Sequence, residues 1–91
     1  MTYRIAFQMD PMEGVDINAD TTFALAEVAM ERDMLLYEYG PEHLVYNEGR
    51  IQAWARPMQV RRVEGSHVSF KDRRLIDLED DIDVVLSLIH I

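Results

Sequence analysis

Alternation of apolar and polar side chains predicts a strand, a helix and a second strand in the first forty residues. Residues 3–9 alternate with the two-residue period of a β-strand. Residues 10–20 carry short polar side chains and predict a loop. A helix is expected from about residue 21 to residue 33, and a strand over residues 34–39. Two strands joined by a crossover helix are the parallel unit of an α/β sheet.

The expected helix has little polar surface. At 100° per residue its strongly polar stripe consists of Glu27 and Glu31, and apolar side chains occupy most of the remaining circumference. We therefore expect this helix to be covered on more than one side. Asp20 is the expected N-cap, with Thr21 and Thr22 as alternatives, because a side-chain oxygen there accepts from the free N–H groups of the first turn.

A β-hairpin is predicted after the second strand. Residues 44–46 and 51–55 flank a turn of sequence Asn-Glu-Gly-Arg, in which Gly49 supplies the positive φ angle. Pro57 lacks the N–H group that a central strand needs, so the chain beyond it is expected to form an edge or bulged strand.

The last third of the chain predicts one further strand. Residues 66–78 give no clear pattern, and no structure is assigned to them. Five acidic residues within residues 77–83 predict a solvated loop. The apolar, β-branched residues 82–86 then predict a buried strand, which completes an α/β arrangement.

Composition restricts the class of protein further. The chain has 91 residues, of which 48% are hydrophobic and 29% charged, as expected for one small globular domain. Seventeen acidic against nine basic residues give a net charge of -8, which argues against nucleic-acid and anionic-membrane partners. The absence of cysteine excludes disulfides and thiolate zinc sites. No apolar run is long enough to span a membrane, and we expect a cytoplasmic protein.

The loop between the first strand and the helix holds the best candidate site residues. Asp10 ends the strand, and the helix begins at Asp20, so both would line a crevice whose free N–H groups suit a carboxylate ligand. An equally good interpretation is that Asp10 and Asp20 satisfy backbone donors of the loop and cap. The loop contains one glycine, Gly14, and no phosphate-binding glycine motif, which argues against a nucleotide-phosphate site.

The histidines and the basic residues do not form a recognisable site. His43, His67 and His90 lie far apart and lack metal-ligand spacing. A basic region near Trp54 suggests single-stranded nucleic acid, but the net charge opposes this and pairing with local acids explains it as well. The region comprises Arg56, Arg61, Arg62, Lys71, Arg73 and Arg74.

Two strings resemble the N-terminus of the prokaryotic glutathione synthetases. They are IAFQMDPM at residues 5–12 and DTTFA at residues 20–24. The similarity covers residues 3 to about 86 in register, and its order and spacing make it more specific than any single piece. It continues through residues 36–39, 47–50, 53–60, 78 and 81–86.

The resemblance implies a fold and a reaction. The family joins γ-glutamylcysteine to glycine with ATP and magnesium, through an acyl-phosphate intermediate. Its N-terminal part is a Rossmann-like pre-ATP-grasp domain with a parallel sheet, one main crossover helix and a β-hairpin excursion. ATP and metal ligands lie in later domains, so no catalytic, cofactor-binding or metal-binding residue is expected here. The substrate-cleft candidates that the resemblance implies are Asp10, Pro11, Asp20, Thr21 and Thr22.

The resemblance also implies partners, namely the remaining domains of the parent enzyme and its small-molecule substrates; a homo-oligomeric state is left open.

The final hexapeptide departs from the family, which continues with a basic residue and Asp-Pro-Pro. Residues 86–91, LSLIHI, instead resemble a translated transposon-end adapter. We therefore expect residues 1–86 to be an incomplete, inactive pre-ATP-grasp domain and residues 87–91 to be a non-native tail. The alternative is a stand-alone acidic α/β module that binds a small anionic metabolite.

Overall fold

The computed structural model describes residues 2–14, 21–63 and 65–87. Its elements are β1 (Arg4–Gln8), the 3-10 helix η1 (Met12–Gly14), α1 (Thr21–Glu31), β2 (Leu35–Tyr39), the 3-10 helix η2 (Pro41–His43), β3 (Leu44–Asn47), β4 (Arg50–Val60), β5 (Val68–Phe70), β6 (Arg74–Asp77) and β7 (Val84–Ser87).

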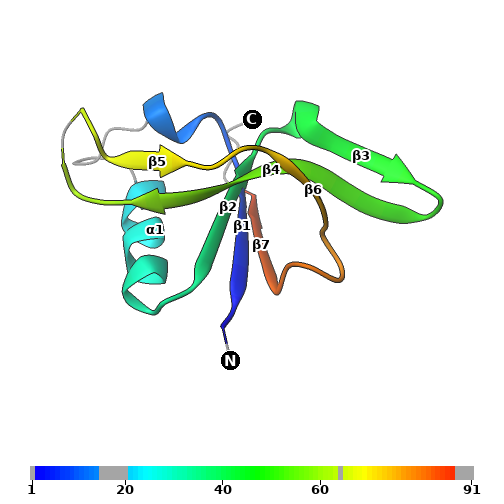
Figure 1. The fold of residues 1–91 in the computed structure, drawn as a ribbon, viewed down its shortest axis with the longest axis horizontal. Coiled ribbons are helices and arrows are strands. Elements are labelled where there is room, and N and C mark those ends of the chain that lie inside the picture. The colour runs from blue at the N-terminus through cyan, green and yellow to red at the C-terminus, as the bar shows by residue number, and fades with distance from the viewer. Residues whose placement is uncertain (1, 15–20, 64, 88–91) are drawn as a thin grey trace.

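The strands form a mixed sheet with a parallel centre, as Figure 1 shows. β1 lies between β2 and β7 and runs parallel to both, so that Ile5 faces Leu36 on one side and Val84 on the other. β4 adds to β2 in the antiparallel direction and also pairs with β3, β5 and β6. The predicted α/β class is confirmed, and the parallel sheet of the prediction proves to be the centre of a larger mixed one.

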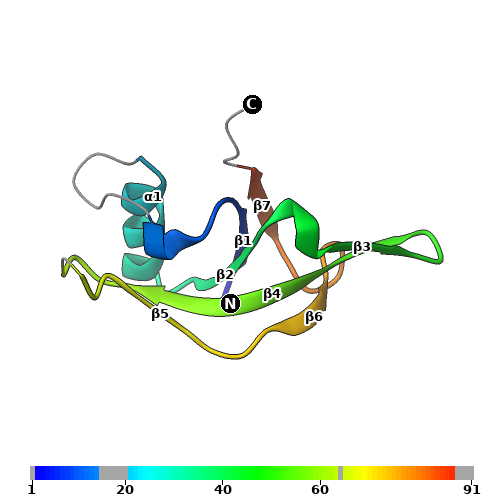
Figure 2. The same cartoon turned by 90° about the horizontal axis from the view of Figure 1, so that it is seen from above.

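Each face of the sheet has its own apolar core. Alternate residues of β1 and β2 point to the same face, and Ile5, Phe7 and Leu36 pack there against Phe23 and other residues of α1. The opposite face carries a second cluster, which includes Ala6, Tyr39, Ala53, Ala55, Ile76 and Ile82. Figure 2 shows α1 and η1 together on one side of the strands. The alternation predicted for β1 therefore divides its side chains between two cores.

α1 ends two residues earlier than expected because Asp33 leaves the helical conformation. Its φ angle is 57°, in the left-handed region. The N–H of Asp33 donates to the Met30 carbonyl, and the N–H of Met34 reaches back to the Ala29 carbonyl, both at 3.0 Å. These two bonds are the pattern of a Schellman motif, in which glycine usually occupies the left-handed position.

The predicted hairpin is confirmed. In the strand that was expected to be an edge or bulged strand beyond Pro57, Met58 pairs on both sides, whereas Gln59 and Val60 pair with β5. Gly49 has a φ angle of 81°, and β4 continues through Pro57 with partners on both sides. The Pro57 carbonyl accepts from the Lys71 N–H at 3.0 Å. In an antiparallel strand the N–H and C=O groups of one residue point to the same side. The position where Pro57 lacks an N–H group therefore faces residues 71–73, which lie between β5 and β6 and belong to neither strand. Proline is tolerated in β4 because the neighbouring chain bulges there.

The segment left unassigned by the sequence contains β5 and β6, which both pair with β4. The acidic residues that follow form a turn in which Glu79, Asp80 and Asp83 are exposed, as expected, while Asp77 and Asp81 are partly buried. In this turn the Asp77 carboxylate accepts from the backbone N–H groups of Glu79 and Asp80, at 2.8 and 3.1 Å. Asp77 is therefore held by local backbone donors and by Arg50, whose Nε donates to its other carboxylate oxygen at 2.6 Å.

The outer surface of α1 is less covered than expected. Its buried residues are Thr22, Phe23, Ala26 and Ala29. By contrast, Leu25 is 40% and Val28 is 46% exposed. Among the described residues, then, α1 is covered on one side. No helix in this part of the chain is long and apolar enough to cross a membrane.

The predicted foreign tail falls mostly outside the described residues. Ser87 is the last residue of β7 and pairs with Gln8 of β1. Residues 88–91 are not among the described ones. The division at residue 86 therefore stays a prediction.

Candidate functional site

The carboxyl ends of β1 and β2 and the start of α1 lie at the same end of the molecule (Figure 1). The Met9 N–H donates to the Tyr39 carbonyl at 3.0 Å, which holds the two strand ends together. In open α/β folds, ligands bind beyond the carboxyl ends of the strands. A ligand-binding site is therefore expected at the loop that follows β1.

The structure brings four of the five predicted cleft residues to this end. Asp10 and Pro11 are exposed and follow β1 directly, and Thr21 is exposed at the start of α1. Thr22 is buried in the first turn of the helix. Asp20, together with its predicted capping role, lies outside the described residues. A cleft role for these residues stays a prediction.

Asp10 and Pro11 differ in how they are held. The Asp10 carboxylate makes no hydrogen bond or ion pair with a residue in the described part of the chain, and it is exposed. The Pro11 carbonyl accepts from the Gly14 N–H at 3.1 Å, which closes the turn of η1. No donor in the described residues thus accounts for the Asp10 carboxylate.

The loop after Pro11 is anchored through the backbone of Met12. The Met12 N–H donates to Glu38 Oε2 at 2.8 Å, and its carbonyl lies 2.8 Å from His67 Nε2. Because a carbonyl only accepts, His67 must carry a proton on Nε2. The His67 ring also packs edge-on against Phe23 of α1, with the ring centroids 5.8 Å apart. Two buried side chains from distant segments therefore fix the loop that carries Asp10 and Pro11.

Glu38 is the centre of a buried charge cluster at the end of β2. Its side chain is 2% exposed. Arg56 of β4 donates to both carboxylate oxygens, from Nε at 2.9 Å and from Nη2 at 3.0 Å. Such a two-point contact between a guanidinium and a carboxylate is among the strongest hydrogen-bonded ion pairs.

Arg56 extends this cluster to η1 and to β5. Its Nη2 also donates to Glu13 Oε1 at 2.6 Å, and its guanidinium lies 3.4 Å from the centre of the Phe70 ring. Burial alone would lower the pKa of Arg56, but the hydrogen bonds to Glu38 and Glu13 outweigh it and raise this pKa. Arg56 therefore keeps its charge and links three segments that are distant in the sequence.

Sequence reasoning missed Glu38 as a site residue, although a signal for it exists. In β2 it shares a face with Leu36, which belongs to the apolar core, so a carboxylate at this alternation position needs a buried partner. Arg56 was assigned to the basic region, and its pairing with Glu13 and Glu38 agrees with the interpretation that these arginines meet local acids. Arg62 likewise pairs with Glu27.

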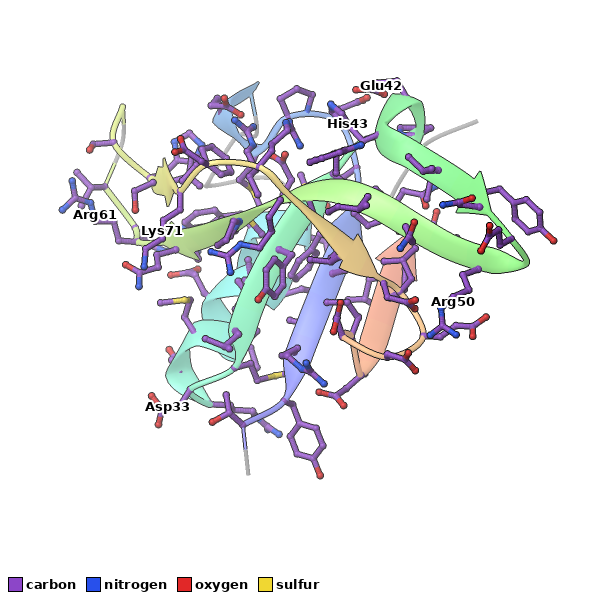
Figure 3. The ribbon with its side chains drawn as sticks, turned by 45° about the vertical axis from the view of Figure 1, so that its right-hand side comes forward. Asp33, Glu42, His43, Arg50, Arg61 and Lys71 are labelled. Atoms are coloured by element: carbon purple, nitrogen blue, oxygen red, sulfur yellow. The ribbon has the colours of Figure 1, made fainter. Side chains whose placement is uncertain are left out.

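The other polar groups serve local structure. His43 Nδ1 accepts from the Gly40 N–H at 3.0 Å, and Figure 3 shows Glu42 and His43 at the opposite end of the molecule from Asp33. Arg50 contacts the acidic turn through Asp77 and Asp80. His90 lies outside the described residues.

ATP and magnesium have no fitting site in the described chain. These residues contain no group of three or more histidines or carboxylates that could hold a metal ion. The cations nearest to the loop after β1 are engaged with Glu13 and Glu38. We therefore derive no chemical step through either group.

Comparison with known proteins identifies the domain. Residues 3–87 match the family described as prokaryotic glutathione synthetase, N-terminal domain. The chain is 41% identical over 86 residues to a glutathione synthetase of Mesorhizobium japonicum, an alignment that covers 94% of this chain and 27% of the relative. It is 36% identical over 81 residues to the glutathione synthetase of Agrobacterium fabrum, covering 89% of this chain and 25% of the relative.

A third relative, the glutathione synthetase of Brucella melitensis, is 37% identical over 86 residues, with 94% of this chain and 27% of the relative covered. The chain thus spans about a quarter of the length of these relatives. The family match extends over the loop after β1, the anchored Met12 and the whole central sheet. This chain belongs to the family of prokaryotic glutathione synthetase N-terminal domains.

Proposed function

We propose that this chain acts as the N-terminal part of a glutathione synthetase, which joins γ-glutamylcysteine to glycine with ATP and magnesium in the cytoplasm. The observation that carries the proposal is the family match over residues 3–87. On this proposal the chain contributes part of the substrate cleft and does not catalyse ligation by itself. The nucleotide, the metal and the groups that hold them belong to the remaining domains, which are its partners.

Within the cleft, Asp10 and Pro11 would contact the peptide substrate from the loop after β1, and Asp20, Thr21 and Thr22 from the start of α1. The anchoring of Met12 by Glu38 and His67 supports a positioning role for this loop. A loop held at a defined place reduces the entropy that is lost when substrate binds. Glu38 and His67 are accordingly positioning residues.

The test is a ligation assay on a longer protein that joins residues 1–86 to the remaining domains of the Mesorhizobium japonicum relative. ADP release that depends on both γ-glutamylcysteine and glycine is expected from this protein and not from the 91-residue chain. Asp10→Ala in the longer protein should raise KM for γ-glutamylcysteine, whereas the exposed control Glu31→Gln should leave KM unchanged. Release of ADP without peptide formation would contradict the proposed reaction.

If Asp10→Ala changes neither KM nor kcat, Asp10 leaves the list of cleft residues while the ligase proposal stands. Ligation by the 91-residue chain alone would overturn the claim that this part is inactive by itself. Unfolding measurements on both variants show whether a change in KM reflects loss of structure, because a destabilised protein has a lower denaturation midpoint in urea.

A further inference from the structure

Arg56 presents a guanidinium whose position is fixed from within the protein. Glu38 holds it at two points, and the Phe70 ring lies against its plane at 3.4 Å. The Arg56 side chain is only 16% exposed. An arginine locked in this way loses little rotamer freedom when it binds a further anion.

Glu13 covers the outer side of this guanidinium. It contacts Arg56 Nη2 at 2.6 Å, and its side chain is 53% exposed. Glu13 comes from η1, on the loop that follows β1. Ion pairs with such an exposed partner are weak, because solvent screens the two charges. A carboxylate from solution can therefore compete with Glu13 for Arg56.

A second guanidinium lies beside the first. Arg73 Nη2 is 3.9 Å from Glu38 Oε1, and Arg73 Nη1 donates to the Trp54 carbonyl at 3.0 Å. Both arginines also lower the pKa of Glu13, so both lie near its carboxylate. Two cations and two carboxylates balance each other here. When the Glu13 carboxylate moves away, the group keeps one uncompensated positive charge.

We propose that Arg56 and Arg73 form a binding subsite for a free carboxylate of an amino acid or peptide, and that Glu13 occupies this subsite when no ligand is bound. The subsite lies at the carboxyl end of β2, beside the loop that carries Asp10 and Pro11. It deepens the proposed function, on which the identity of the ligand rests, because γ-glutamylcysteine and glycine both carry free carboxylates. The Glu13 side chain acts as an internal substitute for this group.

The experiment measures binding to the 91-residue chain by NMR. γ-Glutamylcysteine, glycine and acetate are titrated separately at constant ionic strength, while the Nε–H signals of Arg56 and Arg73 are followed. Glu13→Gln should tighten binding of the carboxylates about 1.4- to 5-fold, the factor that corresponds to an exposed ion pair. The control is Glu31→Gln, which removes the same charge from an exposed position on α1 and should bind as the unaltered chain does.

Two further titrations test which class of anion the subsite binds. Chloride, titrated in the same way, should shift these signals much less than the carboxylates do, because it cannot make a two-point contact with a guanidinium. Arg73→Gln in the Glu13→Gln background should reverse the tightening while Glu38 still holds Arg56. Equal binding by Glu13→Gln and Glu31→Gln would overturn the proposal, and so would equal responses to chloride and acetate.

The outcome is independent of the ligation assay. Carboxylate binding without ligation by the longer protein would leave the subsite in place and remove the proposed reaction. Ligation without any effect of Glu13→Gln on carboxylate binding would do the opposite. The substituted side chain is half exposed on a short 3-10 helix, so the variant is expected to fold like the unaltered chain.

Discussion

Glu38 and Glu13 both pair with Arg56, but their side chains differ in burial. Glu38 is buried, and both its oxygens accept hydrogen bonds from Arg56, with a further bond from the Met12 N–H. Glu13 shares the same arginine but is half exposed. The two glutamates therefore contribute to stability in different ways, and substitutions at each position separate these contributions.

Glu38→Gln should destabilise the chain by about 2 to 4 kcal/mol, because it removes the charge that compensates the buried Arg56 guanidinium. Urea unfolding followed by circular dichroism measures this loss, with a stabilising osmolyte present if the variant is unfolded in buffer. Glu31→Gln, at an exposed position, should change stability by less than about 0.5 kcal/mol. Similar midpoints for the two variants would show that the Glu38–Arg56 pair contributes little.

Glu13 predicts a pH dependence of stability. Its burial acts to raise its pKa, but the hydrogen bond and charge of Arg56 outweigh this and hold the pKa below the ordinary value of 4.5. A carboxylate with a depressed pKa stabilises the folded state above its unfolded pKa, and this stabilisation is lost as the pH falls through the folded pKa. The contribution of Glu13 is thus fully present at pH 7 and declines below about pH 4.5.

The measurement compares the unaltered chain with Glu13→Gln in urea between pH 7 and pH 3. The unaltered chain should be more stable by about 0.2 to 1 kcal/mol at pH 7, and the difference should shrink towards zero at pH 3. A difference that is constant over this range would mean that the ionised form of Glu13 has no special contact with Arg56.

At the scale of elements, local geometry at the helix end explains where α1 stops. The apolar pattern alone extends the helix to residue 33, whereas the left-handed φ angle of Asp33 ends it after Glu31. An apolar pattern predicts which face is buried but does not report the backbone conformation of the residue that reverses the chain. β4 gives a similar example. Pro57 is tolerated in this strand because β5 ends before the position where an N–H donor would be needed, and the apolar pattern does not show where β5 ends.

Asp33→Gly should stabilise the chain by about 0.5 to 1 kcal/mol, because glycine adopts the left-handed conformation without the steric cost of a Cβ atom. The matched control is Glu31→Gly in the last turn of α1, where a helical backbone makes glycine unfavourable by about 1 kcal/mol. Thermal unfolding should raise the midpoint for the first variant and lower it for the second. A lower midpoint for Asp33→Gly would show that the aspartate side chain itself stabilises the turn.

At the scale of the whole molecule, the sheet joins two kinds of arrangement. Its parallel centre of β2, β1 and β7 has α1 on one face, whereas β4 extends beyond this centre and carries β3, β5 and β6. β4 thus couples the two cores, since Met58 belongs to one of them and Ala53 and Ala55 to the other. This long strand also places Arg56 beside the carboxyl end of β2.

Most arginines of the basic region contact other residues of the described chain. Of the basic region, Arg56, Arg62 and Arg73 meet carboxylates and Arg61 contacts Ser66, so four of its arginines are engaged within the described chain. This arrangement fits the net charge of -8, which disfavours a polyanionic partner. It agrees with the interpretation that these arginines pair with local acids.

Local patterns in the sequence suffice to predict most elements and the family. Strand and helix periods depend on neighbours two to four residues away, so β1, α1, β2, β3 and β7 could be predicted to within two residues of their bounds, whereas β4 extends five residues beyond the predicted end at residue 55. The order of short motifs also indicated the glutathione synthetase N-terminal domain. The positive φ angle at Gly49 followed from turn chemistry alone.

The construction of the candidate site depends on contacts between segments that are far apart in the sequence. Met12 and Glu38 are separated by 26 residues, and Met12 and His67 by 55, so no local pattern relates them. β5 and β6 are short and form against β4, which explains why their segment gave no signal. The physical reason is the same in each case, because a buried charge or a short strand is stable only when the partner that compensates it is in place.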